Sequence, residues 1–158
     1  RGHRPTSEHS MSRYLLCALF VIAALYSSTP ARAVDTIISK DAPDLTSVRA
    51  KVKAKDFAGA IAELTPLLQT HQHADVYNLL GFSYRKTGDM KQAATFYTKA
   101  LDFDVNHKGA LEYQGEMFVE LGQLERAKAN LRRLEAICPQ GCEEREDLEA
   151  AIAAAMKK

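Results

Sequence analysis

The sequence has no tryptophan, and it has only five prolines and eight glycines in 158 residues. So little proline and glycine excludes a collagen-like chain or a low-complexity linker. The formal net charge of +1 excludes a strong attraction of the whole chain to nucleic acid. Long apolar runs are also missing, because the longest, residues 14–26, falls short of the ~20 residues of a membrane-spanning helix. What remains is an ordinary balance of 46% hydrophobic and 26% charged residues, typical of one globular domain.

The apolar segment 14–26 has the flanks of a secretory signal peptide. Arg13 precedes it, and small residues up to Ala33 follow it. A basic start, a short apolar core and small residues at a cleavage site are the three parts of such a signal. We therefore predict cleavage after Ala33 and a periplasmic or secreted protein, with an uncleaved anchor as the alternative.

Cleavage would divide the chain into residues 1–33, which hold upstream sequence and the signal peptide, and a mature domain of residues 34–158. Residues 1–10 precede a plausible start at Met11 and are expected to lie outside the fold. The mature domain is mildly acidic, which disfavours nucleic acid and anionic membranes as partners. We expect no stable membrane insertion after cleavage.

Residues between 74 and 141 repeat with a period of 34. Small and large residues recur at the same places, as the close packing of two helices in every unit requires. The matched pairs are Gly81 with Gly115, Tyr84 with Phe118, Gly88 with Gly122 and Ala93 with Ala127. Because Gly81 and Gly115 fall inside predicted helices, where glycine costs ~1 kcal/mol, we expect a close helix–helix approach at both.

This pattern resembles the tetratricopeptide repeat. The residues that carry the resemblance in the first unit are Tyr77, Leu80, Gly81, Tyr84, Gly88, Ala93, Tyr97 and Ala100. The second unit departs from the family pattern at Leu111 and Gln114. The resemblance implies an all-α fold, a right-handed α-solenoid of about three helix-turn-helix repeats with a C-terminal capping helix. With the run from Gly141 to Leu148, the chain over roughly residues 40–150 also resembles short exported bacterial proteins of this family.

The predicted domain has four parts: a degenerate repeat at 41–73, repeats at 74–107 and 108–141, and a capping helix at 142–158. Residues 55–60 align with 88–93, and Pro66 is expected to bend or shorten the second helix of the degenerate repeat. Leu148 and Ile152 share one face of the capping helix, and its charged residues are expected to form a solvated outer face. We therefore predict seven helices, three pairs and a cap.

The resemblance also implies a concave groove, lined by the first helix of each pair, that binds a peptide or protein segment. Transferred by position, the groove residues are Asn78, Phe82, Arg85 and Lys86 in one repeat and Glu112, Tyr113, Glu116 and Glu120 in the next. Phe82 and Tyr113 are candidate anchors, although Phe82 has the alternative of packing against the next repeat. The groove is expected to run from a basic to an acidic end and so to orient its partner.

No motif for catalysis is present in the sequence: it has no glycine-rich phosphate loop, no Gly-x-Ser-x-Gly and no His-Glu-x-x-His. We therefore expect a protein that is not an enzyme and that needs no cofactor. His71, His73 and His107 lie at predicted inter-repeat turns and are interpreted as turn residues.

Cys138 and Cys142 are the only cysteines in the predicted mature domain. In an oxidising compartment they are expected to form a disulfide that holds the capping helix. A redox pair or a Cu(I) site are the alternatives. The sequence thus predicts an interaction module for a protein or peptide. The rivals are a thiol-redox or copper-handling protein and an envelope assembly factor that self-associates.

Overall fold

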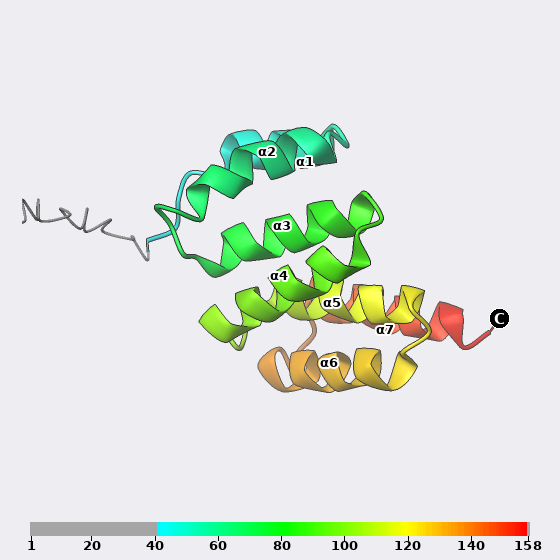
Figure 1. Ribbon diagram of the computed structural model, residues 1–158. Coiled ribbons are helices and arrows are strands. Elements are labelled where there is room, and N and C mark those ends of the chain that lie inside the picture. The colour runs from blue at the N-terminus through cyan, green and yellow to red at the C-terminus, as the bar shows by residue number, and fades with distance from the viewer. Residues whose placement is uncertain (1–40, 158) are drawn as a thin grey trace, which may run out of the picture. The chain divides into compact units, whose positions relative to one another are not determined.

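The computed structural model describes residues 41–157, and the helices in this part of the chain confirm the all-α prediction (Figure 1). The predicted signal peptide and cleavage site lie outside the described residues. The helices are α1 (Thr46–Lys53), α2 (Phe57–Leu67), α3 (Ala74–Lys86), α4 (Met90–Phe103), α5 (Lys108–Glu120), α6 (Leu124–Ile137) and α7 (Glu143–Ala155). None of them combines the length and apolar character that a membrane crossing requires.

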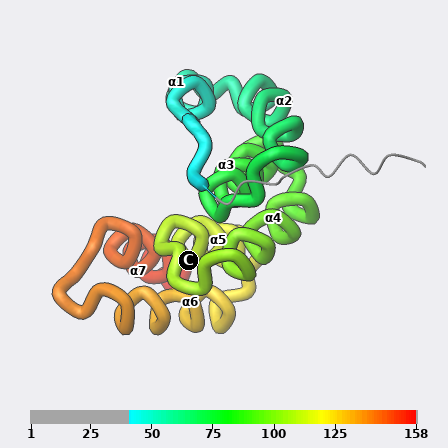
Figure 2. Tube along the Cα trace, turned by 90° about the vertical axis from the view of Figure 1, so that its left-hand side faces the viewer, coloured from blue at the N-terminus to red at the C-terminus, as the bar shows by residue number. Residues whose placement is uncertain are grey.

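The helices pack in sequential pairs, as predicted. α1 packs on α2, α3 on α4 and α5 on α6, and α7 then packs on both α5 and α6. The first residues of α5 and α6 each lie 34 positions after those of α3 and α4. In Figure 2, α1, α3, α5 and α7 lie on one side of the array and α2, α4 and α6 on the other. We call the first group the first-helix face.

The turn inside each pair needs a left-handed residue. Gly88 and Gly122 have φ angles of 88° and 71°. Glycine adopts this conformation without a steric penalty, which ends one helix and starts the next within a few residues. Lys55 occupies the corresponding turn of the first pair with φ of 62°. A side chain costs ~1 kcal/mol in that conformation, so this turn is the most strained of the three.

The two helical glycines mark close helix contacts, as expected. A Cβ on Gly81 would lie 2.6 Å from the Tyr97 ring, and one on Gly115 would lie 2.5 Å from Leu148. The lack of a side chain at Gly81 therefore lets α4 pack closely on α3, and the lack of one at Gly115 lets α7 pack closely on α5. Leu148 is fully buried there, so the capping helix closes the same core that the last repeat forms.

Pro66 has the effect predicted for it. α2 ends one residue after Pro66 and has 11 residues, whereas α4 and α6 have 14 each. Proline has no N–H to continue the ladder of hydrogen bonds, and so it favours an early end.

Candidate functional site

Two adjoining pockets lie on the first-helix face and together form what we call the groove. The first, the acidic pocket, has a volume of about 280 Å³. It is defined here by Arg49, Asn78, Glu112, Glu143, Glu144 and Asp147. These residues come from all four helices of the face, since Arg49 lies on α1 and the last three on α7. A ligand in this pocket would contact the two repeats and the capping helix together.

The second, the apolar pocket, has a volume of about 230 Å³. It is lined by Arg49, Val52, Lys53, Leu79, Phe82 and Tyr113. Arg49, Leu79 and Tyr113 line both pockets, so the two are continuous along the face. An extended chain that crossed the face would meet an apolar pocket beside an acidic one.

Two polar side chains in the acidic pocket are buried without a partner. Glu112 is 6% exposed, and among the described residues no side chain forms an ion pair or hydrogen bond with its carboxylate. Asn78 is also 6% exposed, and its side-chain oxygen has no hydrogen-bond partner within residues 41–157. Buried acceptors are normally paired, so these two are exceptions that need an explanation.

The pKa of Glu112 is raised to about 8. Burial is the main cause, because it disfavours the charged form, and the nearby carboxylates of Glu116, Asp147 and Glu144 add repulsion. The positive charge of Arg85 lowers the pKa of Glu112, but by less than burial and the carboxylates raise it. At neutral pH Glu112 is therefore mostly protonated in the free protein.

The remaining charges of the acidic pocket divide into paired and unpaired groups. Glu144 forms an ion pair with Lys108, with 3.3 Å between its Oε1 atom and the lysine Nζ atom. Glu143 and Asp147 are exposed, and no ion pair joins either of them to another described residue. The unpaired charge of this pocket is therefore negative.

Phe82 and Tyr113 pack on each other, with ring centroids 4.8 Å apart. Phe82 lies on α3 and Tyr113 on α5, so the alternative that Phe82 packs against the next repeat is correct. Phe82 also meets Phe57 of α2 edge to face at 6.1 Å. Both candidate anchors thus have structural contacts, yet both are only half-buried and line the apolar pocket.

The prediction that Arg85 forms part of a basic end of the groove is wrong. This residue is 4% exposed, and its guanidinium group donates to Glu116 at 2.5 Å and to the Tyr113 carbonyl at 3.1 Å. Glu120 lies 3.8 Å from the same group. Because Arg85 and Glu116 neutralise each other between α3 and α5, they form a link between repeats and not the two ends of a charge gradient.

Lys86 is the only one of the two predicted basic residues that stays exposed. Its ammonium group lies 5.2 Å from the centre of the Phe82 ring, at the edge of the groove. Glu120 is half-exposed at the far end of α5. Of the eight predicted groove residues, the structure places Asn78, Phe82, Glu112 and Tyr113 on the two pockets.

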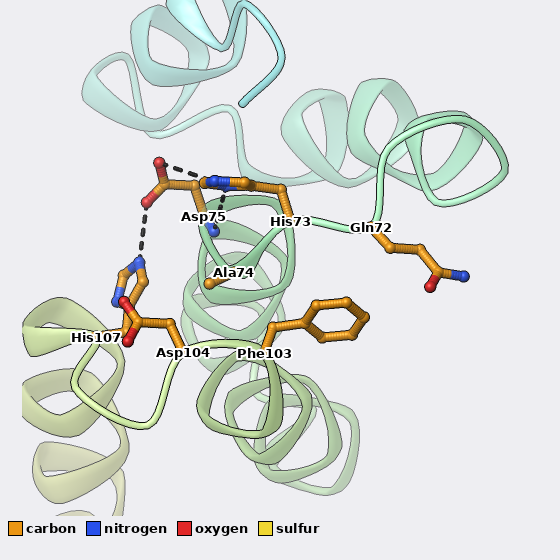
Figure 3. Close-up of a pocket in the computed structure, with 7 residues that line it drawn as sticks. All are labelled: Gln72, His73, Ala74, Asp75, Phe103, Asp104 and His107. Carbon is orange, nitrogen blue, oxygen red and sulfur yellow. Dashed lines mark hydrogen bonds and ion pairs between the residues drawn. The ribbon is translucent and has the colours of Figure 1, made fainter. Parts of the chain in front are cut away.

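The histidines at the turns have a role that the sequence interpretation missed. His73 and His107 are the N-cap residues of α3 and α5. His107 accepts from the Ala110 N–H through Nδ1 at 3.0 Å, so its Nε2 carries the proton and donates to Asp75 at 2.9 Å. Asp75 lies between the two imidazole rings (Figure 3). Their spacing of 34 residues was the signal that could have revealed a repeated capping function.

These side chains border a third pocket of about 440 Å³ that also includes Phe103 and Asp104 (Figure 3). Its histidines and Asp75 already contact one another or the backbone. Within residues 41–157 no three His, Cys, Asp or Glu side chains are arranged to hold a metal ion. We therefore assign this cluster to the joint between α3 and α5.

Cys138 and Cys142 form the predicted disulfide. Cys138 is the C-cap of α6 and Cys142 the N-cap of α7. The bond thus joins the end of the last repeat directly to the start of the capping helix, while Arg145 donates to the Cys138 carbonyl at 3.4 Å. We expect the bond to act as a local clip that holds the start of α7 against the end of α6.

Replacing both cysteines with serine is expected to lower the free energy of unfolding by about 1–2 kcal/mol, below the ~3 kcal/mol of a 15-residue loop. The loop is short, so little chain entropy is removed from the unfolded state. Urea denaturation of the variant and the unmodified protein measures the change. Hydrogen exchange should become faster in α7 of the variant than in the unmodified protein, with a smaller change in α3. A loss of more than about 4 kcal/mol, or unchanged exchange in α7, would contradict a local clip.

The sequence interpretation did not assign Arg49, Glu143, Glu144 or Asp147 to the groove. Arg49 lies in the degenerate repeat, and the three acidic residues belong to the capping helix, where charge was interpreted as a solvated face. Only the packing of α7 beside α5 brings these carboxylates to the pocket.

Residues 74–107 match the sequence profile of the tetratricopeptide repeat. The match covers α3, α4, the turn between them and residues 104–107. No curated protein is significantly similar to the chain. The profile match and the paired helices agree on a helical repeat of a kind that generally binds proteins.

Proposed function

We propose that this protein is an exported, non-catalytic interaction module that binds an extended segment of a partner protein in the groove. The observation that carries this proposal is the continuity of the two pockets across α1, α3, α5 and α7. A segment of several residues fits such a surface better than a small ligand does, because neither pocket is closed. The tetratricopeptide match supports a protein partner in general.

Export is the part of the proposal that concerns the first 33 residues. The order of basic, apolar and small residues before Val34 supports it. Expression of the full chain, fractionation of the cells and N-terminal sequencing test it. A mature protein that begins at Val34 outside the cytoplasm is expected, and a full-length cytoplasmic protein would overturn the assignment.

Site-specific photocrosslinking tests the groove. A photoreactive amino acid is placed at Lys53 or Glu143, which are exposed at the two pockets, and at Glu135 or Thr95, which are exposed on α6 and α4. Full-length variants are irradiated in the producing cells. We expect a discrete crosslinked protein from both groove positions and none from the outer positions.

The same crosslinking result separates the proposal from its rival. A crosslinked product with the mass of two copies of this chain would indicate the self-associating assembly factor. Equal crosslinking from groove and outer positions would contradict a groove that binds one segment.

A further inference from the structure

The acidic pocket contains hydrogen-bond acceptors for which the described residues supply no donors. We propose that it binds the guanidinium group of an arginine side chain in the partner segment, while an apolar side chain next to that arginine enters the apolar pocket. This inference rests on the proposed function and specifies the chemistry of the segment that the groove takes.

Two acceptors of the acidic pocket have no donor among the described residues. The Asn78 side-chain oxygen and the Glu112 carboxylate come from α3 and α5, and both residues line the same pocket. The fully buried Asn78 oxygen without a donor destabilises the protein, because it has lost its hydrogen bonds to water. A ligand that brings N–H groups would supply donors to both acceptors, and so to two helices at once.

The unpaired charge at the acidic pocket is negative among the described residues. Glu143 and Asp147 of α7 add unpaired carboxylates at the mouth of the pocket. Arg49, the cation of the pocket on α1, already lies 3.7 Å from an Asp75 carboxylate oxygen. The pocket therefore attracts a cationic group, and a cation that enters it is not repelled by an unpaired positive charge.

The placement of the acceptors favours one kind of cation over the others. The acceptors stand on three different helices, and within the described residues they are not gathered as a metal site would be. A guanidinium group presents five N–H donors in a planar fork and can serve several separated acceptors together. An ammonium group has three donors on one atom. The dispersed acceptors thus favour arginine.

The apolar pocket would take the side chain next to the arginine. Tyr113 and Leu79 line both pockets, and Phe82, which packs on Tyr113, lines the apolar one. A residue next to the bound arginine would reach this apolar surface. The preferred segment is therefore arginine followed or preceded by an aliphatic residue.

Binding of the cation should also move a proton. The raised pKa of Glu112 leaves its carboxyl group protonated below about pH 8, and a guanidinium partner favours the charged form. Affinity is then expected to rise with pH up to about pH 8, with release of a proton on binding. The other charged or titratable groups around Glu112 are Arg49, Asp75, Arg85, His107, Tyr113, Glu116, Glu143, Glu144 and Asp147.

The test uses the full chain and two capped peptides, acetyl-Gly-Arg-Leu-Gly-amide and its counterpart with citrulline, which has the shape of arginine without its charge. NMR titration follows the backbone amides. We expect the arginine peptide to shift resonances in α3, α5 and α7, and the citrulline peptide to bind at least about tenfold more weakly. Equal binding of the two peptides, or no shift with either, would overturn the inference.

Two variants tie the binding to the pocket. Glu112→Gln keeps the size of the side chain and is expected to weaken binding of the arginine peptide about tenfold and to abolish its dependence on pH. Asn78→Leu removes the unpaired oxygen and should weaken binding while the protein stays folded. Glu135→Gln on α6 removes the same charge away from the groove and should change neither property.

The inference and the proposed function can fail separately. If Glu112→Gln binds the arginine peptide as the unmodified protein does, arginine recognition by this pocket is wrong. Crosslinking from Lys53 and Glu143 would still establish the groove as the binding surface. If crosslinking from those positions also fails, the groove itself is contradicted.

Discussion

Glu112→Gln is expected to stabilise the protein by about 2–3 kcal/mol at pH 8 and to have little effect at about pH 5. The native protein holds a proton on Glu112 up to about pH 8, whereas the unfolded chain releases it near the ordinary value of 4.5. The contribution of Glu112 to the free energy of unfolding is therefore fully present below about pH 4.5, and it is lost as the pH rises toward 8. The expected gain in the free energy of unfolding is smaller than the full pKa shift would give, because the pocket is open to water, which screens the charge.

Urea denaturation of the variant and the unmodified protein at both pH values measures this effect. Glu135→Gln is the control, since its carboxylate is exposed on α6 and should give the same small change at both pH values. A stability difference for Glu112→Gln that does not grow with pH would contradict the raised pKa. Because the variant should be more stable yet bind the arginine peptide less well, unfolding is not an explanation for lost binding.

Arg85→Met is expected to lower the free energy of unfolding by about 2–4 kcal/mol. Methionine is an unbranched aliphatic side chain that lacks the guanidinium group, whose carbon lies 5.8 Å from the centre of the Phe82 ring and 6.0 Å from that of Tyr113. Glu116 would remain between α3 and α5 without its partner, and the Tyr113 carbonyl would lose its donor. An uncompensated carboxylate in a half-buried site is strongly destabilising.

A surface ion pair provides the matched control. Lys128 lies 2.9 Å from Glu125 on α6, where Glu125 is largely exposed. Lys128→Met should change stability by less than about 0.5 kcal/mol. The double variant Arg85→Met with Glu116→Gln should recover part of the loss, because no unpaired charge is left. Equal effects of Arg85→Met and Lys128→Met would contradict the structural role of Arg85.

Features that depend on local chemistry were predictable from the sequence. Gly88 and Gly122 locate two turns because glycine adopts a left-handed conformation most readily, and Pro66 locates the early end of α2 for a similar local reason. Gly81 and Gly115 indicated close helix contacts because glycine is unfavourable in a helix unless something needs the space. Repetition at 34 residues then extended these local signals to an all-α fold.

The composition of the groove depended on which helices meet in space. Arg85 was predicted as a groove cation, but Glu116 on the next first helix neutralises it. Glu143 and Asp147 were interpreted as a solvated face, but α7 packs on α5 and brings them to the same pocket as Glu112. Helix formation depends on neighbours within a few positions of the sequence. Charge pairing and burial depend on neighbours about one repeat away, so only the tertiary structure decided which carboxylates and amides remain unpaired.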